Sequence, residues 1–296
     1  MSAAKLSEGD FPSLFQAADT ASVKAQNSYT LLVRMDLILT VLGALLSSLP
    51  AQGFNEKSIL NIFGVIVLAV AFIISLALRW TRFERTWYGG RAVAESVKSL
   101  SWLYMTGAKP FLQTLGSQKA DKLFADRLGE IMVERKNLAF DFTNNLADQI
   151  SKAMSAIRQG SLDDRKTRYV NERIREQRAW YSSKSGFNRK RAKLYFGIAL
   201  SFQAFAFIWA ILLIRWTELP NLVGVIAAIT TALFSWMQIR KFQELAQVYA
   251  LTAQELGLVE AKSSGVTTET HLSSFVSDAE NAISREHTLW IARRDH

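Results

Sequence analysis

Four long stretches of the chain contain no charged residue, and they constrain the fold more than any other feature. Three of them, Ile59–Leu78, Leu194–Ile214 and Leu219–Ile239, hold 20 or 21 residues each. An α-helix needs about 20 apolar residues to cross roughly 30 Å of hydrocarbon, so these three fit a bilayer. The first stretch, Leu37–Leu49, is shorter and fits only if the charged residues just before it lie at the interface. We therefore expect an all-α, four-span membrane protein made of two transmembrane helical hairpins with extended cytoplasmic helices.

Two other interpretations of the apolar stretches are weaker. A buried helix of a soluble protein rarely has 18 or more uncharged residues in a row, and here four such stretches pair into two hairpins. The first stretch does not resemble a signal peptide. More than thirty residues precede it, acids among them (Glu8, Asp10 and Asp19), and no small-residue cleavage pattern follows.

The basic residues predict the orientation of the spans, because Lys and Arg are retained on the cytoplasmic side of short flanking segments. Fourteen flank the outer ends of the hairpins, whereas the two hairpin loops hold only Lys57 and Arg215. The fourteen are Lys24, Arg34, Arg79, Arg82, Arg85, Arg91, Lys98, Lys184, Arg189, Lys190, Arg191, Lys193, Arg240 and Lys241. This asymmetry predicts a multi-pass membrane protein with both termini in the cytoplasm. Much of the net charge of +9 is thereby explained by topology.

The most basic segment, residues 163–193, admits a second interpretation. It holds eleven Lys or Arg and four Asp or Glu, interleaved with Tyr169, Trp180, Tyr181 and Phe187. Basic residues among aromatic ones can bind single-stranded nucleic acid. The segment leads directly into the third apolar stretch, however, where cations contact anionic lipid headgroups. We therefore expect it to face the lipid bilayer and consider nucleic acid an unlikely partner.

An internal repeat divides the chain. Sliding the sequence by 161 residues places Asn27 on Asn188, Arg79 on Arg240, Tyr88 on Tyr249 and Ala92 on Ala253, and the second apolar stretch on the fourth. Each half has a polar helix, a hairpin and a polar helix, which indicates duplication of one unit. We predict a first transmembrane-hairpin unit over 1–115, a cytoplasmic helical connector over 116–160, and a second hairpin unit with cytoplasmic C-terminal helices over 161–296.

Signals for catalysis are weak throughout. The absence of cysteine excludes disulfides, cysteine-ligated metal centres and thiol nucleophiles. His271, His287 and His296 lack metal-ligand spacing, and Gly89 with Gly90 forms no phosphate-binding loop. We expect a protein that is not an enzyme and that needs no cofactor or metal.

The fourth apolar stretch has a face of small side chains. Gly224, Ala228, Thr231, Ala232 and Ser235 lie along it at helical spacing, so another helix can approach closely there. These residues are candidates for helix packing or for lining a narrow pore. No ionisable residue lies within the uncharged stretches, which disfavours ion-coupled transport.

The segments that leave the two hairpins resemble a known family. The first carries Trp87, Arg91, Glu95 and Lys98, followed by Trp102 and Tyr104. The second half has Trp180 and Tyr181 before its hairpin, Tyr249 to Leu256 after it, and Glu280 to Arg294 near the end. These positions resemble a tandem arrangement of SLATT domains, the two-transmembrane effector domains associated with SMODS nucleotidyltransferases and SLOG nucleotide-sensing domains. The shared positions are aromatic and charged residues on helices and do not form a catalytic signature.

The resemblance implies a bacterial inner-membrane effector of an antiphage or conflict system that causes abortive infection. Such an effector would form a homo-oligomer and make a pore or disrupt the membrane when triggered by a nucleotide signal, a nucleotide-sensing protein or a nucleotidyltransferase partner. Six residues are candidates for carrying the signal from cytoplasmic helices to the spans, or alternatively form an interfacial aromatic belt with snorkelling cations. The six are Trp87, Arg91, Glu95, Lys98, Trp102 and Tyr104. Two alternatives remain: a non-enzymatic membrane-anchored scaffold or binding protein, and an ordinary ion channel.

Overall fold

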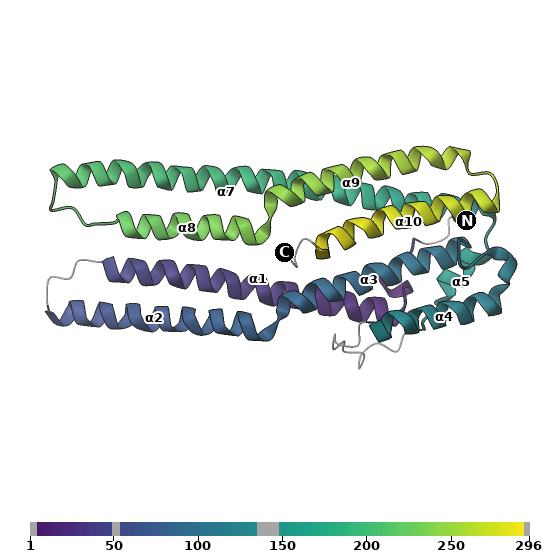
Figure 1. Ribbon diagram of the computed structural model, residues 1–296, viewed down its shortest axis with the longest axis horizontal. Helices are drawn as coiled ribbons and strands as arrows, with labels where there is room; N and C mark the ends of the chain where they lie inside the picture. The colour runs from purple at the N-terminus through teal and green to yellow at the C-terminus, as the bar shows by residue number, and fades with distance from the viewer. Residues whose placement is uncertain (1–4, 49–53, 135–147, 293–296) are drawn as a thin grey trace. The chain divides into compact units, whose positions relative to one another are not determined.

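The computed structural model describes residues 5–48, 54–134 and 148–292, and the regular elements in these ranges are all helical (Figure 1). The helices are α1 (Ser13–Ser48), α2 (Phe54–Thr81), α3 (Phe83–Thr106), α4 (Ser117–Glu134), α5 (Lys152–Gln159), α6 (Leu162–Tyr169), α7 (Glu176–Arg215), α8 (Val223–Arg240), α9 (Phe242–Lys262) and α10 (Glu269–Ala292). A π-helical segment, Val170–Arg175, joins α6 to α7, and short 3-10 turns occupy Glu8–Asp10, Gln113–Leu115 and Ser263–Gly265. The predicted all-α class with four membrane-capable helices is confirmed.

The chain forms two compact units. We call residues 27–83 and 184–248 the span unit, and residues 1–26, 84–183 and 249–296 the bundle unit. Helices α1, α7 and α9 contribute residues to both units, and α3 contributes its first residue, Phe83, to the span unit. The division separates the apolar hairpins from the remaining helices and differs from the predicted division along the sequence, which stays a prediction.

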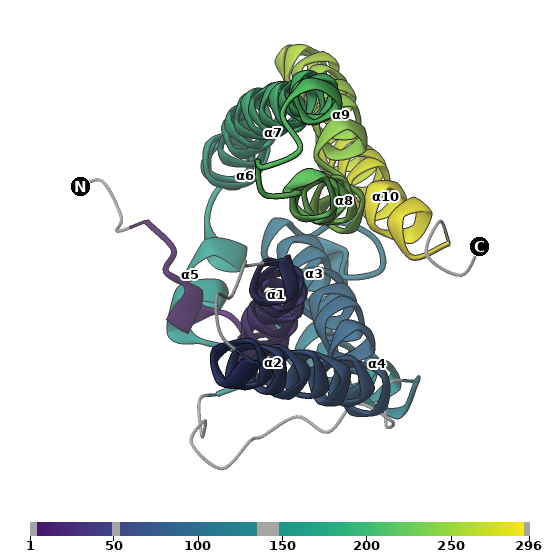
Figure 2. The same cartoon turned by 90° about the vertical axis from the view of Figure 1, so that its left-hand side faces the viewer.

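The span unit consists of the hairpins α1–α2 and α7–α8, seen end on in Figure 2. Its apolar side chains are more exposed than is usual for a protein surface in water. In the most apolar window of the helical stretch ending at Arg215, 6% of the residues are buried, and Phe72, Phe207 and Ile214 are 64%, 69% and 82% exposed. Such continuous apolar surface is stable against lipid tails, which solvate it.

Contacts inside the span unit are concentrated at two places. At one end, a cluster built on Val33, Trp236 and Phe242 draws side chains from α1, α2, α7, α8 and α9 together. Along the first hairpin, glycine allows α1 and α2 to approach closely. A methyl group placed at Gly43 would lie 2.5 Å from a Leu68 side-chain carbon, and one at Gly64 would lie 3.4 Å from the Ser47 hydroxyl.

The fourth span begins later than the sequence suggests. Helix α8 starts at Val223, whereas the apolar stretch starts at Leu219. Pro220 explains the difference, because proline disfavours helical backbone at the residue before it. The indole N–H of Trp209 on α7 donates to the Pro220 carbonyl at 3.1 Å and holds the turn against the preceding helix.

A single residue separates each descending span from the helix that follows it. Arg82 lies between α2 and α3 with φ of 48°, and Lys241 lies between α8 and α9 with φ of 46°. Both are left-handed, a conformation that costs a residue with a Cβ roughly 1–2 kcal/mol. We call these two positions the joints. They lie 159 residues apart, two fewer than the 161-residue offset of the sequence repeat.

A buried ion pair lies at the centre of the bundle unit. Arg173 of the π-helical segment is fully buried, and its Nε and Nη2 donate to both carboxylate oxygens of Glu280 on α10 at 3.0 and 2.9 Å. The hydroxyls of Tyr169 and Ser99 donate to the same carboxylate at 2.9 and 2.6 Å. Burial disfavours the charge on Arg173, but Glu280 more than offsets this and raises its pKa. The carboxylate thereby connects α3, α6 and α10.

The π-helical segment keeps Arg173 on the same buried side as Arg165 of α6. Arg173 follows Arg165 after eight residues, one more than the seven that make about two α-helical turns. One extra residue would rotate it away in a regular α-helix, but a wider π-helical turn accommodates that residue and keeps Arg173 directed into the core.

The ion pair generates a stability prediction. We expect Glu280→Gln to lower the free energy of unfolding by about 3–5 kcal/mol, because it leaves the Arg173 charge buried without a counter-charge. The measurement is chemical or thermal unfolding of the detergent-solubilised chain. The control is Glu260→Gln, which removes surface pairs with Arg175 and Arg178 and should cost within about 1 kcal/mol. Equal losses for the two variants would contradict the central role of the buried pair.

Candidate functional site

Helix α3 places four of the six predicted coupling residues on one face. Trp87, Arg91, Glu95 and Lys98 follow one another at intervals of four, four and three residues, which brings them to the same side of a helix. They line a cleft of about 300 Å³ together with residues of α1, α7 and the N-terminal 3-10 turn. We call it the coupling cleft. Its remaining lining residues are Glu8, Phe15, Asp19, Ser22, Val23, Gln26, Ala94, Glu176, Gln177 and Trp180.

A close crossing of α1 and α3 forms the floor of the coupling cleft. Gly90 of α3 lies against the α1 backbone, so that an added methyl group would be 2.9 Å from the Ala18 carbonyl oxygen. About one helical turn before Gly90, the Trp87 carbonyl accepts a hydrogen bond from the Ser22 hydroxyl at 2.8 Å. The absence of a side chain at Gly90 therefore lets the two helices touch and fixes the positions of Trp87 and Arg91.

The coupling cleft holds charges close to aromatic rings. The Arg91 guanidinium lies 5.7 Å from the centre of the Trp180 ring, and the Lys98 ammonium lies 5.4 and 5.5 Å from the rings of Phe11 and Phe15. Cation–π contacts of this kind strengthen when water is excluded. The arrangement joins α3 to α7 on one side and to the N-terminal segment on the other.

Burial shifts the pKa of two groups in the coupling cleft. It raises the pKa of Asp19, and the nearby carboxylates of Glu8 and Glu95 add to the rise. It lowers the pKa of Lys98, an effect that Glu95 opposes. Glu95 also approaches the buried pair, with its Oε2 3.7 Å from Nη1 of Arg173. A change of charge at Glu95 therefore alters the electrostatic environment of the buried Arg173–Glu280 pair.

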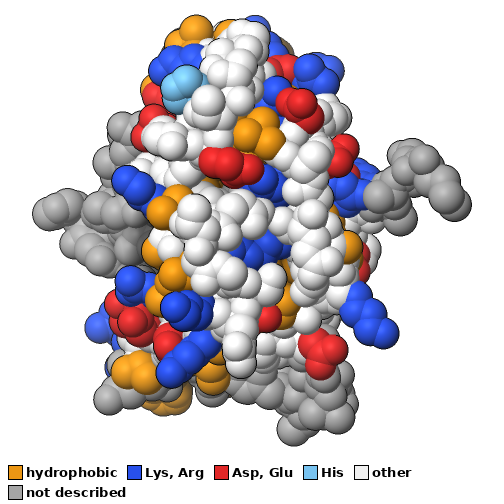
Figure 3. All heavy atoms as spheres, turned by 90° about the vertical axis from the view of Figure 1, so that its right-hand side faces the viewer, with side chains coloured by type: hydrophobic (Ala, Val, Ile, Leu, Met, Phe, Trp, Pro, Cys, Tyr) orange, Lys and Arg blue, Asp and Glu red, His pale blue; other side chains and the backbone are white. Residues whose placement is uncertain are grey.

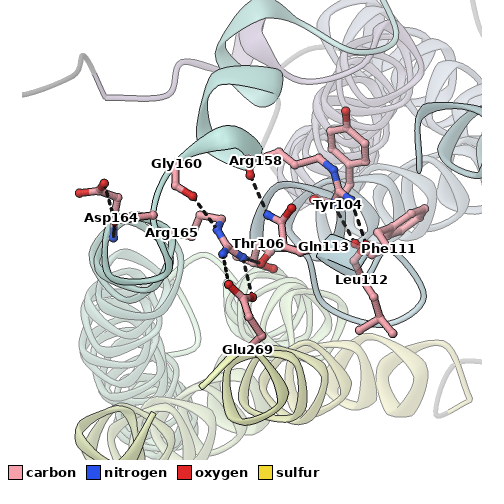
Figure 4. Close-up of polar contacts among 11 residues, drawn as sticks. Tyr104, Thr106, Phe111, Leu112, Gln113, Arg158, Gly160, Asp164, Arg165 and Glu269 are labelled. Carbon is pink, nitrogen blue, oxygen red and sulfur yellow. Dashed lines mark hydrogen bonds and ion pairs between the residues drawn. The ribbon is translucent and has the colours of Figure 1, made fainter. Parts of the chain in front are cut away.

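Two buried arginines hold the C-terminal end of α3 (Figure 4). Nη1 of Arg158 donates to the carbonyls of Tyr104 and Phe111, each at 2.8 Å. Nη1 of Arg165 donates to the Thr106 carbonyl at 2.5 Å, and its guanidinium pairs with both carboxylate oxygens of Glu269 on α10. The last carbonyls of a helix lack partners within it, and cations there also favour its dipole. Arg158 and Arg165 therefore anchor the helix that carries the cleft residues.

The other two coupling candidates lie away from the cleft. Trp102 is 1% exposed and contacts Tyr169 edge-on, with ring centres 5.5 Å apart. Tyr104 is equally buried, and its hydroxyl donates to Asp121 at 2.5 Å. Burial and this carboxylate raise the pKa of Tyr104. Both residues belong to the core of the bundle unit, on the same helix as the cleft.

The small-residue candidates on α8 lie along a partly open face. Gly224 and Thr231 are exposed, while Ala228, Ala232 and Ser235 are half-buried. A methyl group placed at Gly224 would meet no atom within 4 Å. Their role in packing or pore lining stays a prediction; in the first hairpin, close helix contact occurs at Gly43 and Gly64.

The first half of the basic segment at residues 163–193 spends part of its positive charge inside the bundle unit. Arg165 and Arg173 are buried, and Arg175 and Arg178 are exposed but pair with Glu260, so contact of this segment with the bilayer stays a prediction. Their partners lie 82 to 107 residues away in the sequence. The exposed cations of the segment are concentrated after residue 183.

Metal binding has no geometric support in the part of the chain that the structure describes. There, no group of three or more His, Cys, Asp or Glu side chains could hold a metal ion. Arg91 and Lys98 of the coupling cleft contact aromatic rings, and Lys98 interacts electrostatically with Asp19 and Glu95. The arrangement is suited to transmitting a displacement between helices.

Comparison with known families gives two matches that together cover most of the chain. Residues 12–166 match the family described as SMODS and SLOG-associating 2TM effector domain 3. Residues 169–290 match the family described as SMODS and SLOG-associating 2TM effector domain 1. No curated protein and no solved structure matches the chain. The coupling cleft is lined from both matched segments, because Trp87 lies in the first and Trp180 in the second.

The crossing at Gly90 generates a second stability prediction. We expect Gly90→Ala to destabilise the chain by about 1–3 kcal/mol, because the new methyl group would press on α1 backbone atoms that cannot move independently. The measurement is the free energy of unfolding in detergent. Gly129→Ala on α4 is the matched control: no atom lies within 4 Å of its added methyl group, and it should stabilise by up to about 1 kcal/mol. A gain in stability at both positions would refute the close crossing.

Proposed function

Because this chain belongs to the SLATT family of SMODS- and SLOG-associating two-transmembrane effectors and carries two such domains in tandem, we propose that it is a non-enzymatic effector of a bacterial antiphage or conflict system. It resides in the inner membrane, assembles into a homo-oligomer and opens a pore or disrupts the bilayer when triggered. The proposal rests on one observation: the chain combines four outward-facing apolar helices with a charged cleft on α3, the helix that follows the second span directly.

The trigger acts on the coupling cleft. A nucleotide-sensing protein or a nucleotidyltransferase product that displaces Arg91 or Glu95 would disturb contacts on α7 and the buried Arg173–Glu280 pair. Arg82 is the single residue that connects α2 to α3, and Lys241 is the single residue that connects α8 to α9. A tilt of either cytoplasmic helix would therefore pass to a span through one backbone position.

The orientation of the spans follows from the distribution of positive charge. With both termini in the cytoplasm, the bundle unit lies where an intracellular nucleotide signal is produced. The exposed cations near the ends of the hairpins, such as Arg79, Arg189 and Lys193, would then meet the inner leaflet.

A labelling experiment tests this orientation. The natural chain has no cysteine, so each single-cysteine variant carries one reporter. In intact spheroplasts we expect a membrane-impermeant maleimide to label Thr217→Cys in the second hairpin loop and to leave Ser182→Cys on α7 unlabelled until the membrane is opened. Both positions are exposed in their own units, so accessibility within the protein is matched. The reverse pattern would place the bundle unit outside the cell.

A membrane-potential experiment tests the effector activity. The chain is expressed with its genomic neighbours, and a potential-sensitive dye is followed after phage infection. We expect depolarisation with the natural chain and a large loss of it with Arg91→Gln, which removes the contact with Trp180. Arg85→Gln, an exposed position on the same helix, is the control and should depolarise normally.

The alternatives have distinct outcomes in the same experiment. Full protection with an intact membrane potential would contradict pore formation and favour a membrane-anchored scaffold. Steady conductance before infection would contradict a triggered effector and favour an ordinary ion channel.

A further inference from the structure

The outer face of α7 in the span unit carries a groove that the proposed function does not use. The groove has a volume of about 520 Å³ and is lined by Lys193, Leu194, Gly197, Ile198, Ser201, Phe202 and Phe205. Apart from Lys193 at one end, its lining is apolar or small. The Ser201 hydroxyl donates to the Gly197 carbonyl of its own helix at 2.9 Å, so its hydrogen-bonding capacity is already used.

The cationic end of the groove lacks counter-charges. Arg189, Lys190 and Lys193 are exposed, and none of them forms an ion pair within 4 Å with another described residue. Arg189 and Lys193 are four residues apart, so these like charges face each other on the helix surface and repel. An anion held between them would remove that repulsion.

The bundle unit contains buried and surface ion pairs. Its described ion pairs include Arg165 with Glu269, Arg173 with Glu280, and Lys5 with Glu176. The face of the bundle unit shown in Figure 3 has basic and acidic side chains intermixed. On α7, by contrast, the cations at residues 189–193 follow one another without an acidic residue where the helix enters the apolar stretch.

We propose that this groove binds one anionic phospholipid, with its phosphate between Arg189 and Lys193 and an acyl chain along Gly197, Ser201 and Phe205. The length is suitable, because Phe205 lies twelve residues beyond Lys193, a rise of about 18 Å along the helix. Half of the hydrocarbon core is roughly 15 Å. Gly197 gives the groove its depth, since no atom lies within 4 Å of the position its side chain would occupy.

A second copy of the chain fits the groove less well. Copies in one membrane share an orientation and therefore place their own Arg189 and Lys193 at the same depth. Docking of two copies through this face would bring cations together without a carboxylate to separate them. A lipid phosphate has the opposite charge and occurs at that depth.

Native mass spectrometry of the purified full chain tests the proposal. The probes are phosphatidylglycerol and phosphatidylcholine with identical acyl chains. We expect selective retention of phosphatidylglycerol and about fivefold weaker retention for each cation removed by Arg189→Gln or Lys193→Gln. Arg79→Gln, an exposed cation at the end of α2 outside the groove, should leave retention unchanged. Equal retention of the two lipids by the natural chain would overturn the proposal.

A pair of glycine variants separates lipid binding from assembly. Gly197→Leu fills the groove and should abolish retention while every cation is kept. Gly186→Leu on α7 outside the groove is matched, because no atom lies within 4 Å of its added side-chain carbon either, and it should retain the lipid. If Gly197→Leu alters the oligomer and not lipid retention, the groove is an interface between copies and the proposal fails. These measurements use the resting protein, so they are independent of whether triggering causes depolarisation.

Discussion

The buried pair of Arg173 and Glu280 is the interaction on which the bundle unit depends. A charge this deeply buried is tolerated only when its partner and the surrounding hydrogen bonds are in place, and here the partners come from α3, α6 and α10. Ser99 belongs to the first matched domain, whereas Arg173 and Glu280 belong to the second. The tandem domains therefore share one polar centre in this unit, and the coupling cleft touches that centre through Glu95.

Two solvents account for the contrast between the units. In the bundle unit, large side chains such as Trp102, Tyr169 and Phe124 are fully buried, as water requires. In the span unit, residues such as Phe72 and Ile214 are largely exposed, because lipid tails solvate them. Association between spans therefore depends on close packing of side chains, as at Gly43 and in the cluster around Trp236, because lipid removes the advantage of apolar burial.

The sequence predicts what depends on neighbouring residues. Hydrophobic run lengths predict the spans, and a regular spacing predicts the shared face of Trp87, Arg91, Glu95 and Lys98. The sequence does not predict features that depend on distant partners. Arg165 and Arg173 belong to a basic segment that suggests an exposed surface, yet both are buried because Glu269 and Glu280, about a hundred residues away, neutralise them. The other walls of the coupling cleft, on α1 and α7, are likewise brought to α3 only by folding.

The segments that follow the two joints share one hydrogen bond and then differ. The backbone carbonyl of the fifth residue after each joint accepts a hydrogen bond from a serine hydroxyl. Ser22 of α1 donates to Trp87 of α3 at 2.8 Å, and Ser185 of α7 donates to Ala246 of α9 at 2.7 Å. Three residues further on the halves diverge, since Gly90 occupies this position in the first half and Tyr249 in the second. The ring of Tyr249 lies 5.5 Å from that of Tyr181, so the second half has an aromatic contact at this position. The glycine instead lets α1 and α3 touch in the first half, so the two halves pack their entering and leaving helices differently.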